Sequence, residues 1–313
     1  MFVENILVAA EVVIPMILMI GVGILLRLTN IIDPPSMKKL DRIVFKVFLP
    51  MMAFCNIYNA DFSQISAVKL TVYSVCGLLA VFFCCWFLIP KFISSPPTAA
   101  AFGQALLRPN YLVFGVAVAT SLYGAENLGI VMLAGIVVIP VYNTCITILM
   151  EHWREEKSST GQLLLAIIKN PMIISSVLGA VFHFCRIPIP GLVLGVLEDL
   201  GGLTSPLCFV SMGVGLSFAS GSKTRLALIT AAIRLGLIPM VLVTGGIFLG
   251  FRGIELCTLM ILFASPTAVA SYPTAVAMGA DHEYTAQAIA VSLVSSMTTI
   301  FVWIFVLCGL QLL

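Results

Sequence analysis

Charged residues are scarce in this sequence, and their scarcity excludes most classes of protein. Only 10% of the 313 residues are Asp, Glu, Lys or Arg, whereas 60% are hydrophobic and the mean hydropathy is +1.12. Soluble globular domains carry about 25% charged residues and disordered chains are poor in hydrophobic ones, so neither class fits. The net charge of +2 gives no reason to expect a nucleic-acid partner. The composition instead predicts a protein embedded in a lipid bilayer.

The motifs of metal binding, of catalysis within the membrane and of ATP-driven transport are also missing. The nine cysteines all lie in apolar segments without metal-ligand or redox spacing, which is typical of packing residues. The chain has no nucleotide-binding loop, no H-E-x-x-H helix, and no paired Asp or Ser–His combination at membrane depth. We therefore expect no enzymatic activity, no catalytic residue, no metal site and no bound cofactor.

What the sequence does contain is long apolar segments separated by short polar connections. Each segment is long enough to cross about 30 Å of hydrocarbon as an α-helix. The first lacks the basic start and the cleavage site of a signal peptide, so we expect it to be retained. The sequence thus predicts an all-α membrane protein with ten transmembrane helices. The segments lie near residues 5–28, 40–60, 67–90, 98–123, 127–150, 162–186, 192–219, 225–250, 254–279 and 284–312.

Lys and Arg residues are distributed unevenly between the two sets of loops. If the N-terminus lies outside, the inner loops hold ten of these residues and the outer loops hold three. Because inner loops of membrane proteins are enriched in Lys and Arg, we predict a multi-pass protein of the cell (plasma or inner) membrane with both termini outside. The loop around Asp61 is then outside, and the loops with Lys38-Lys39 and Glu155-Glu156 are inside. The inner residues are Arg27, Lys38, Lys39, Arg42, Lys91, Arg154, Lys157, Lys169, Lys223 and Arg225, and the outer ones are Lys69, Arg186 and Arg252.

Prolines and glycines of the two halves of the chain coincide at a constant offset of 156 residues. The chain therefore reads as two five-helix repeats, residues 1–156 and 157–313. An odd number of helices inverts the second repeat, and inverted repeats are typical of secondary transporters with a substrate site near the membrane midplane. The matched pairs are Pro15 and Pro171, Gly23 and Gly179, Pro34 and Pro190, and Pro50 and Pro206, and a shift of one residue pairs Pro109 with Pro266.

Segment 98–123 carries Arg108-Pro109-Asn110-Tyr111 near its centre. The proline lacks a backbone donor and disfavours helical backbone at the residue before it, so we expect the helix to break there. Lipid cannot satisfy the freed polar groups, which places the break against protein or a wet cavity. Arg108 has no acidic residue in its segment, and the sequence leaves two roles for it. It either caps the carbonyls of the first half-helix or pairs with a bound anion.

Segment 254–279 contains two prolines among small residues, in Ser265-Pro266-Thr267 and in Ser271-Tyr272-Pro273. Small residues allow another backbone to approach closely. Two broken helices at matching positions predict a crossing, at which the positive N-terminal ends of half-helices favour an anion. The predicted substrate-binding residues are Arg108, Pro109, Asn110, Tyr111, Ser265, Pro266 and Thr267.

Polar side chains in the flanking segments are candidates for lining a cavity or an ion site. No Asp or Glu lies at depth in segments 98–123, 127–150, 254–279 or 284–312, so no proton relay is evident there. The coupling ion, if the protein uses one, is H⁺, or Na⁺ held by carbonyl, amide and hydroxyl oxygens. Arg234 lies within its segment and either extends to the interface or pairs with an acid. The candidate lining residues are Asn143, Thr144, Ser271, Ser292, Ser295 and Ser296.

Several motifs resemble those of the auxin efflux carrier family, whose bacterial members include proposed malate and malonate permeases. The stretch from Arg108 to Tyr111, followed by Phe114-Gly115, is similar to the Arg-Gly-Asn-Tyr…Gly signature of that family, with Pro109 in place of the usual Gly. Further motifs match in order over essentially the whole chain. They are Leu40…Val47-Phe48-Leu49-Pro50…Phe54, Pro206…Met212-Gly213…Leu216, Ser265-Pro266-Thr267-Ala268-Val269 and Val291-Ser292-Leu293-Val294-Ser295-Ser296.

The resemblance implies a fold like that of bile-acid and sodium–proton exchangers, with broken helices 4 and 9 crossing each other. It implies a scaffold domain of helices 1, 2, 6 and 7, and a transport core of helices 3–5 and 8–10. It also implies that Asn110 and the crossing prolines contact an anionic substrate.

We therefore expect a secondary active transporter of a small organic anion, either auxin-like or a dicarboxylate, that works by alternating access. The alternatives are an uncoupled facilitative exporter and a non-transporting membrane sensor of the same fold. The expected partners are the organic anion, the lipid bilayer and a second copy bound through the scaffold helices as a homodimer.

Overall fold

The protein is described here from a computed structural model, which describes residues 2–59, 68–124, 128–153, 169, 171–215 and 221–313. The loops with Asp61 and with Glu155-Glu156, and the predicted repeat boundary at residue 156, lie outside the described residues. Within them the protein is all helical, and the only β-type pairing is an isolated bridge between Pro109 and Thr267.

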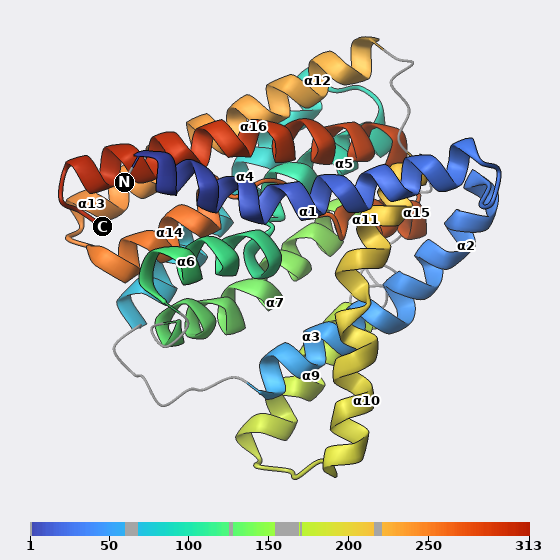
Figure 1. Ribbon diagram of the computed structural model, residues 1–313, viewed down its shortest axis with the longest axis horizontal. Coiled ribbons are helices and arrows are strands. Elements are labelled where there is room, and N and C mark those ends of the chain that lie inside the picture. Colours follow the sequence, from blue (N-terminus) through green and yellow to red (C-terminus); the bar gives the residue numbers. More distant parts are fainter. Residues whose placement is uncertain (1, 60–67, 125–127, 154–168, 170, 216–220) are drawn as a thin grey trace.

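The described helices follow the predicted apolar segments closely (Figure 1). The first half of the chain contains α1 (Phe2–Leu28), α2 (Pro34–Ile43), η1 (Val44–Phe48), α3 (Leu49–Tyr58), α4 (Val68–Phe92), α5 (Pro96–Leu107), η3 (Tyr111–Gly115), α6 (Val116–Tyr123) and α7 (Gly129–His152). The second half contains α9 (Pro171–Phe184), α10 (Gly191–Gly202), α11 (Thr204–Gly215), α12 (Gly221–Ala232), η5 (Ile233–Leu237), α13 (Ile238–Phe248), α14 (Gly253–Ala264), α15 (Ser271–Met278) and α16 (His282–Gly309).

Five uninterrupted or nearly uninterrupted helices among the described residues are long and apolar enough to cross a membrane. They cover Val68–Phe92, Gly129–His152, Gly191–Val214, Lys223–Phe248 and His282–Gly309. The predicted segments 98–123 and 254–279 are both interrupted in the middle. The first contains α5, followed by η3 and α6, and the second contains α14 and α15.

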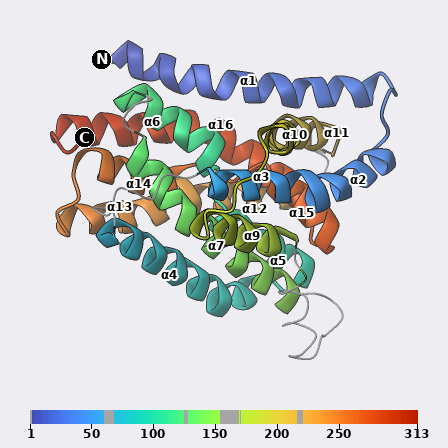
Figure 2. The ribbon, with the colours of Figure 1, turned by 90° about the horizontal axis from the view of Figure 1, so that it is seen from below.

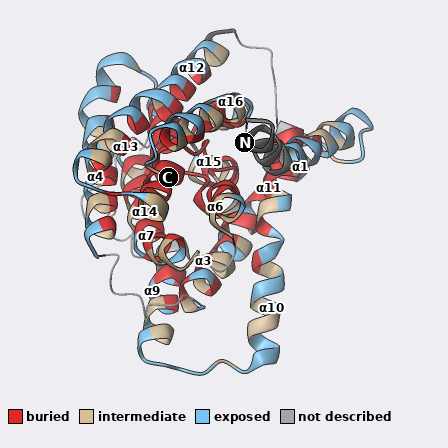
Figure 3. Ribbon diagram, turned by 60° about the vertical axis from the view of Figure 1, so that its left-hand side comes forward, coloured by how far each residue is buried: buried red, intermediate tan, exposed pale blue. Residues whose placement is uncertain are grey.

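The interrupted helices lie in the interior of the molecule. Every residue of α14 from Leu256 to Ala264 is buried, as are most residues of α5 and the first turn of α15 (Figure 3). The outward faces of α4, α10 and α13 instead expose large apolar side chains, among them Phe87, Leu192 and Phe248. Apolar side chains on the outside are expected when lipid is the solvent.

Two glycine contacts hold helices of the two halves together. A Cβ at Gly23 of α1 would lie 2.1 Å from the carbonyl oxygen of Val210 in α11, and a Cβ at Gly179 of α9 would lie 2.9 Å from that of Phe54 in α3. Only a residue without a side chain allows backbones to approach this closely. The two contacts are related by the offset of 156 residues at both of their members. In Figure 2, helix α1 lies along one edge of the molecule.

Two π-helices each precede a proline that lies at the start of the next helix. Leu49 N–H donates to Val44 O in η1, ahead of Pro50, and Ile238 N–H donates to Ile233 O in η5, ahead of Pro239. A proline ring clashes with the carbonyl four residues back, and a wider turn relieves that clash. The helix therefore continues through both prolines instead of breaking.

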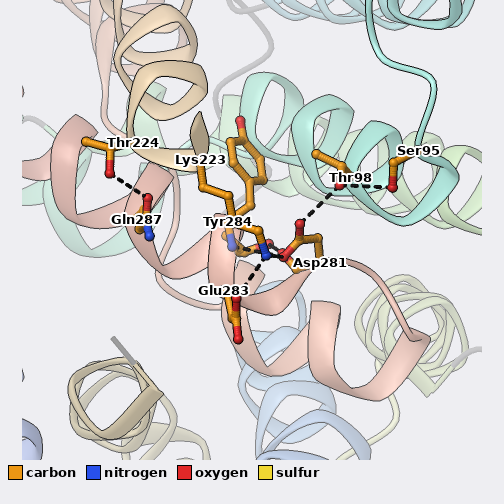
Figure 4. A network of polar contacts seen from close by, with 9 residues as sticks. Ser95, Thr98, Lys223, Thr224, Asp281, Glu283, Tyr284 and Gln287 are labelled. Carbon is orange, nitrogen blue, oxygen red and sulfur yellow. Dashed lines mark hydrogen bonds and ion pairs between the residues drawn. The ribbon is translucent and has the colours of Figure 1, made fainter. Parts of the chain in front are cut away.

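A polar network joins the N-terminal ends of α5, α12 and α16 (Figure 4). Asp281 caps α16 by accepting a hydrogen bond from Tyr284 N–H at 3.0 Å, and its carboxylate also accepts from Thr98 Oγ1 at 3.0 Å and Lys223 Nζ at 3.0 Å. Lys223 Nζ lies 2.9 Å from Glu283 Oε2 as well. Three helices that are distant in sequence are thus fixed at one end of the interior.

Candidate functional site

The two interruptions meet each other. Helix α5 ends at Leu107 and helix α14 at Ala264, and the residues that follow, Arg108 and Ser265, have extended backbone. Asn110 N–H donates to Pro266 O at 2.9 Å, and Ala268 N–H donates to Arg108 O at 3.0 Å. Each break thus satisfies backbone groups of the other, as an interruption within a membrane requires.

Arg108 is buried, and its guanidinium binds protein groups on two other helices. Nη1 donates to Thr274 Oγ1 at 2.7 Å and to Ala270 O at 3.1 Å, and Nη2 donates to Asn143 Oδ1 at 3.0 Å. All of these acceptors are neutral, so they hold the guanidinium in place without cancelling its charge. None of them belongs to α5, whose carbonyls the capping role would use.

Asn110 and the start of η3 leave donors available beside Arg108. The Asn110 side chain is buried, and its amide forms no hydrogen bond with another residue in the described part of the chain. The N–H groups of Tyr111 and Leu112 likewise have no backbone acceptor there, because they open a helix that follows a break. Tyr111 itself is fixed, since its hydroxyl donates to Val131 O at 2.6 Å.

These groups face one small cavity. Its free volume is about 50 Å³, which holds a few water molecules but no carboxylate with a carbon body. One wall belongs to the two breaks and α7, and the other to α3 and α11. The lining residues are Leu49, Met52, Ala53, Asn56, Arg108, Pro109, Asn110, Tyr111, Leu112, Ile139, Tyr142, Asn143, Thr204, Ser205, Cys208, Ala268, Val269 and Ala270.

Of the residues predicted for the substrate, those of the first interruption line the cavity and those of the second do not. Arg108, Pro109, Asn110 and Tyr111 all line the cavity. Ser265, Pro266 and Thr267 do not line it. Thr267 Oγ1 donates to Ala105 O at 2.9 Å, and its N–H donates to Ser292 Oγ at 3.2 Å.

The six residues predicted to line a cavity or an ion site are not gathered in one place. Asn143 lines the cavity and binds Arg108. Thr144 and Ser296 donate to carbonyls of their own helices, and Ser292 bonds to Thr267 and to its own helix. The buried hydroxyl of Ser271 has no partner in the part of the chain that the structure describes, and Ser295 is half-buried away from the cavity. Among the described residues, no cluster of three or more His, Cys, Asp or Glu side chains is arranged to hold a metal ion.

Sequence reasoning missed the wall that comes from α3 and α11. Asn56, Thr204, Ser205 and Cys208 face the two breaks across the cavity. The available signal was the matched pair Pro50 and Pro206, which opens both of these stretches. A buried carboxylate was missed as well: Asp41 of α2 is fully buried and accepts a hydrogen bond from Ser211 Oγ in α11.

Comparison with known proteins places the chain among membrane transport proteins. The chain matches the family described as "Membrane transport protein" over residues 8–304. It is 22% identical to an uncharacterized transporter of Methanothermobacter thermautotrophicus over 312 residues, covering 96% of this chain and 98% of the relative. It is 24% identical to an uncharacterized transporter of Methanocaldococcus jannaschii over 314 residues, covering 95% of this chain and 98% of the relative.

These matches cover nearly the whole chain, and the matched family consists of transporters, not enzymes. They agree with the motif resemblance noted in the sequence. The protein is therefore a multi-pass membrane protein of the membrane transport protein family, the family of the auxin efflux carriers.

Proposed function

We propose that this protein is a secondary transporter of a small organic carboxylate, which it binds where the two interrupted helices meet. The observation that carries the proposal is the convergence of donors on one cavity. Arg108 supplies a full positive charge. Asn110 supplies an amide, and Tyr111 and Leu112 supply N–H groups at a helix start, and these donors have no acceptor among the described residues. Such a set binds an anion through charge-assisted hydrogen bonds and the positive end of the helix dipole.

The apolar part of the lining fits the carbon body of the substrate. Leu49, Met52, Ile139 and Val269 face the cavity beside the donors. A site that pairs a few fixed polar groups with an apolar wall is typical of small-molecule binding. The carboxylate is thus held by the first interruption, and its body packs against α3 and α7.

The small volume of the cavity supports alternating access. A substrate enters only if the wall made by α3 and α11 moves away from the wall made by the breaks. We assign α3 and α11, with α1, α2, α9 and α10, to the scaffold, and the remaining helices to the moving core. The cavity lies between these two groups, so their relative displacement opens it first to one side of the membrane and then to the other.

The finer architecture in this proposal is ten transmembrane helices in two inverted repeats, 1–156 and 157–313, with α5/α6 crossing α14/α15. Its support is the pair of glycine contacts related by 156 residues, together with the reciprocal hydrogen bonds between the two breaks. Both termini outside, coupling to H⁺ or Na⁺, and a homodimer through the scaffold helices remain predictions from the sequence.

Reconstitution into liposomes tests the function directly. We expect uptake of labelled mono- or dicarboxylates by liposomes that contain the protein, saturable in substrate and absent from empty liposomes. Imposing a pH gradient and a Na⁺ gradient separately distinguishes proton coupling, sodium coupling and uncoupled transport. Absence of flux for every carboxylate tested under all gradients contradicts the proposal and favours a sensor of the same fold.

A further inference from the structure

A second buried arginine binds the paired breaks without lining the cavity. Arg234 belongs to η5 and is only 1% exposed. Its guanidinium donates to three backbone carbonyls: Nη1 to Leu106 O at 2.9 Å, Nη2 to Leu262 O at 2.9 Å and Nε to Ser265 O at 3.1 Å. One side chain thereby holds the C-terminal ends of both α5 and α14. The site described above does not include it, since Arg234 does not line that cavity.

The positive charge of Arg234 is opposite in sign and similar in size to the combined charge of the two helix ends. Each helix C-terminus carries about −0.5 of an elementary charge, so α5 and α14 together present about −1 to one guanidinium. No carboxylate among the described residues forms an ion pair with Arg234. The last carbonyls of a helix lack intrahelical donors, and here Arg234 and the Thr267 hydroxyl supply them.

The position of Arg234 follows from the local backbone. Pro239 lies five residues further on, and the wide turn of η5 precedes it. A π-turn displaces the side chains of its residues from the regular helical positions, and such turns often occur at functional sites. The guanidinium therefore reaches inward to the breaks at a depth where an ordinary surface arginine would extend to the interface.

We propose that Arg234 is the positioning residue of the anion site. It clamps the two interruptions together, and it cancels the negative helix ends, so a bound anion experiences only Arg108 and the positive helix starts. The cancellation of charge rests on the proposed function, whereas the clamp on the two interruptions does not. Loss of the positive charge at Arg234 should therefore weaken anion binding without any loss of a contact to the anion.

Two substitutions separate charge from hydrogen bonding. Arg234→Gln keeps donors but removes the charge, whereas Arg234→Lys keeps the charge with a different donor geometry. We expect KM to rise at least tenfold for malonate in Arg234→Gln liposomes and to return most of the way toward the parent value in Arg234→Lys. Arg225→Gln is the matched control, because Arg225 is exposed on the preceding helix α12.

Comparing anions of different charge separates an electrostatic role of Arg234 from a purely structural one, because only the electrostatic role makes the change in KM depend on the charge of the substrate. A change in electrostatic potential acts on each unit of charge, so a dianion loses about twice the binding free energy that a monoanion loses. The factor by which KM rises for malonate should therefore be close to the square of the factor for acetate. Equal factors for the two anions, or equal behaviour of the Gln and Lys variants, overturn the electrostatic part of the proposal.

Hydrogen–deuterium exchange tests the clamp without any substrate. In Arg234→Gln we expect faster exchange in peptides that contain the N–H groups of Asn110 and Ala268, which join the two breaks, than in peptides from α7. Unchanged exchange at both positions in a folded variant overturns the clamp. If the parent protein transports none of the carboxylates tested in liposomes, the proposed transport function fails on that result, while the exchange experiment still decides whether Arg234 holds the breaks.

Discussion

The two buried arginines have different partners, and the difference assigns their roles. Arg234 binds carbonyls at the C-terminal ends of both half-helices, which is the capping role that the sequence also allowed for Arg108. Arg108 binds an amide, a hydroxyl and the carbonyl of Ala270, and it faces the cavity. Because Arg234 already binds those helix ends, we propose that the charge of Arg108 serves the substrate.

Substitution of Arg108 and of Asn110 tests that assignment. Arg108→Gln removes the charge but keeps polarity, and we expect carboxylate binding to weaken by about 1.5–3 kcal/mol, the range for hydrogen bonds to charged groups. Asn110→Ala removes one neutral donor and should cost about 1 kcal/mol. Dissociation constants and melting temperatures are both measured on purified protein. An unchanged dissociation constant with a lower melting temperature for Arg108→Gln means that Arg108 is structural.

At the scale of the elements, both interruptions were predictable from the sequence because a proline acts on its immediate neighbours. Pro109 and Pro266 lie in breaks, as their local chemistry requires. Pro50 and Pro239 have the same local chemistry, yet their helices continue through π-turns. Local sequence therefore predicts where a helix is weakened, whereas the packing around it decides whether the helix breaks.

The partners of the breaks were not predictable in the same way. Asn56 and Ser205 reach the cavity, and Arg234 reaches Leu106, through contacts between residues that are distant in sequence. No periodicity within one segment encodes such a contact. The serines of α16 were predictable as buried residues, but Ser292 and Ser296 use their hydroxyls on carbonyls of their own helix. That competition from the backbone is why they do not form an ion site with the cavity residues.

The close approach of α1 and α11 gives a prediction about stability. In Gly23→Ala the new Cβ would lie 2.1 Å from Val210 O and 2.9 Å from Gly213 Cα, so the helices must separate. Overpacking of this kind typically costs about 1–3 kcal/mol, which thermal unfolding in detergent detects as a lower melting temperature. Gly21→Ala is the control, because its Cβ meets nothing within 4 Å and alanine favours the helix. Equal melting temperatures for the two variants contradict the close contact.

The Asp281 network gives a prediction about pH. Burial opposes ionisation of this carboxyl, but Tyr284 N–H, Lys223 and Thr98 outweigh it and hold the pKa of Asp281 below its usual value of 3.8. A lowered pKa in the folded protein stabilises the fold at neutral pH, and that contribution is lost as the pH falls below about 4 through the folded pKa.

Asp281→Asn isolates the charge, since Asn caps helices nearly as well as Asp. We expect it to lower stability at pH 7 by less than about 1 kcal/mol and to flatten the loss of stability between about pH 4 and pH 3. Asp281→Ala also removes the cap and should cost about 1 kcal/mol more. Melting temperatures of the three proteins across this pH range provide the measurement. A parent and an Asn variant with the same pH dependence would show that the Asp281 charge is not involved.

At the scale of the whole molecule, the arrangement of the chain bears on its orientation in the membrane. The start of α1 and the end of the chain lie at the same end of the protein in both ribbon views (Figures 1 and 2). An even number of membrane crossings places both ends of the chain on the same side. The distribution of Lys and Arg then predicts that this side is the outer one. The N-terminal ends of α5, α12 and α16, with the Asp281 network, are on the inner side in this orientation.

Single-cysteine labelling in a cysteine-free background tests the orientation at two exposed residues. Lys39, an exposed residue within α2, is predicted to face inside, and Arg186, in the turn between α9 and α10, is predicted to face outside. A membrane-impermeant thiol reagent added to intact cells should label Arg186→Cys and leave Lys39→Cys unlabelled until the membrane is opened.

The labelling pattern also tests the repeat, because Lys39 lies at the start of the second predicted segment and Arg186 at the end of the sixth. The ten-helix architecture places these two residues on opposite sides of the membrane. Labelling of both residues from outside would mean that the chain between them crosses the membrane an even number of times, whereas the ten-helix architecture requires five crossings between them. Labelling of Lys39→Cys alone would keep the inverted repeat and reverse the whole molecule. In that case the cavity would be unchanged, and the Lys and Arg distribution would not be what orients this protein.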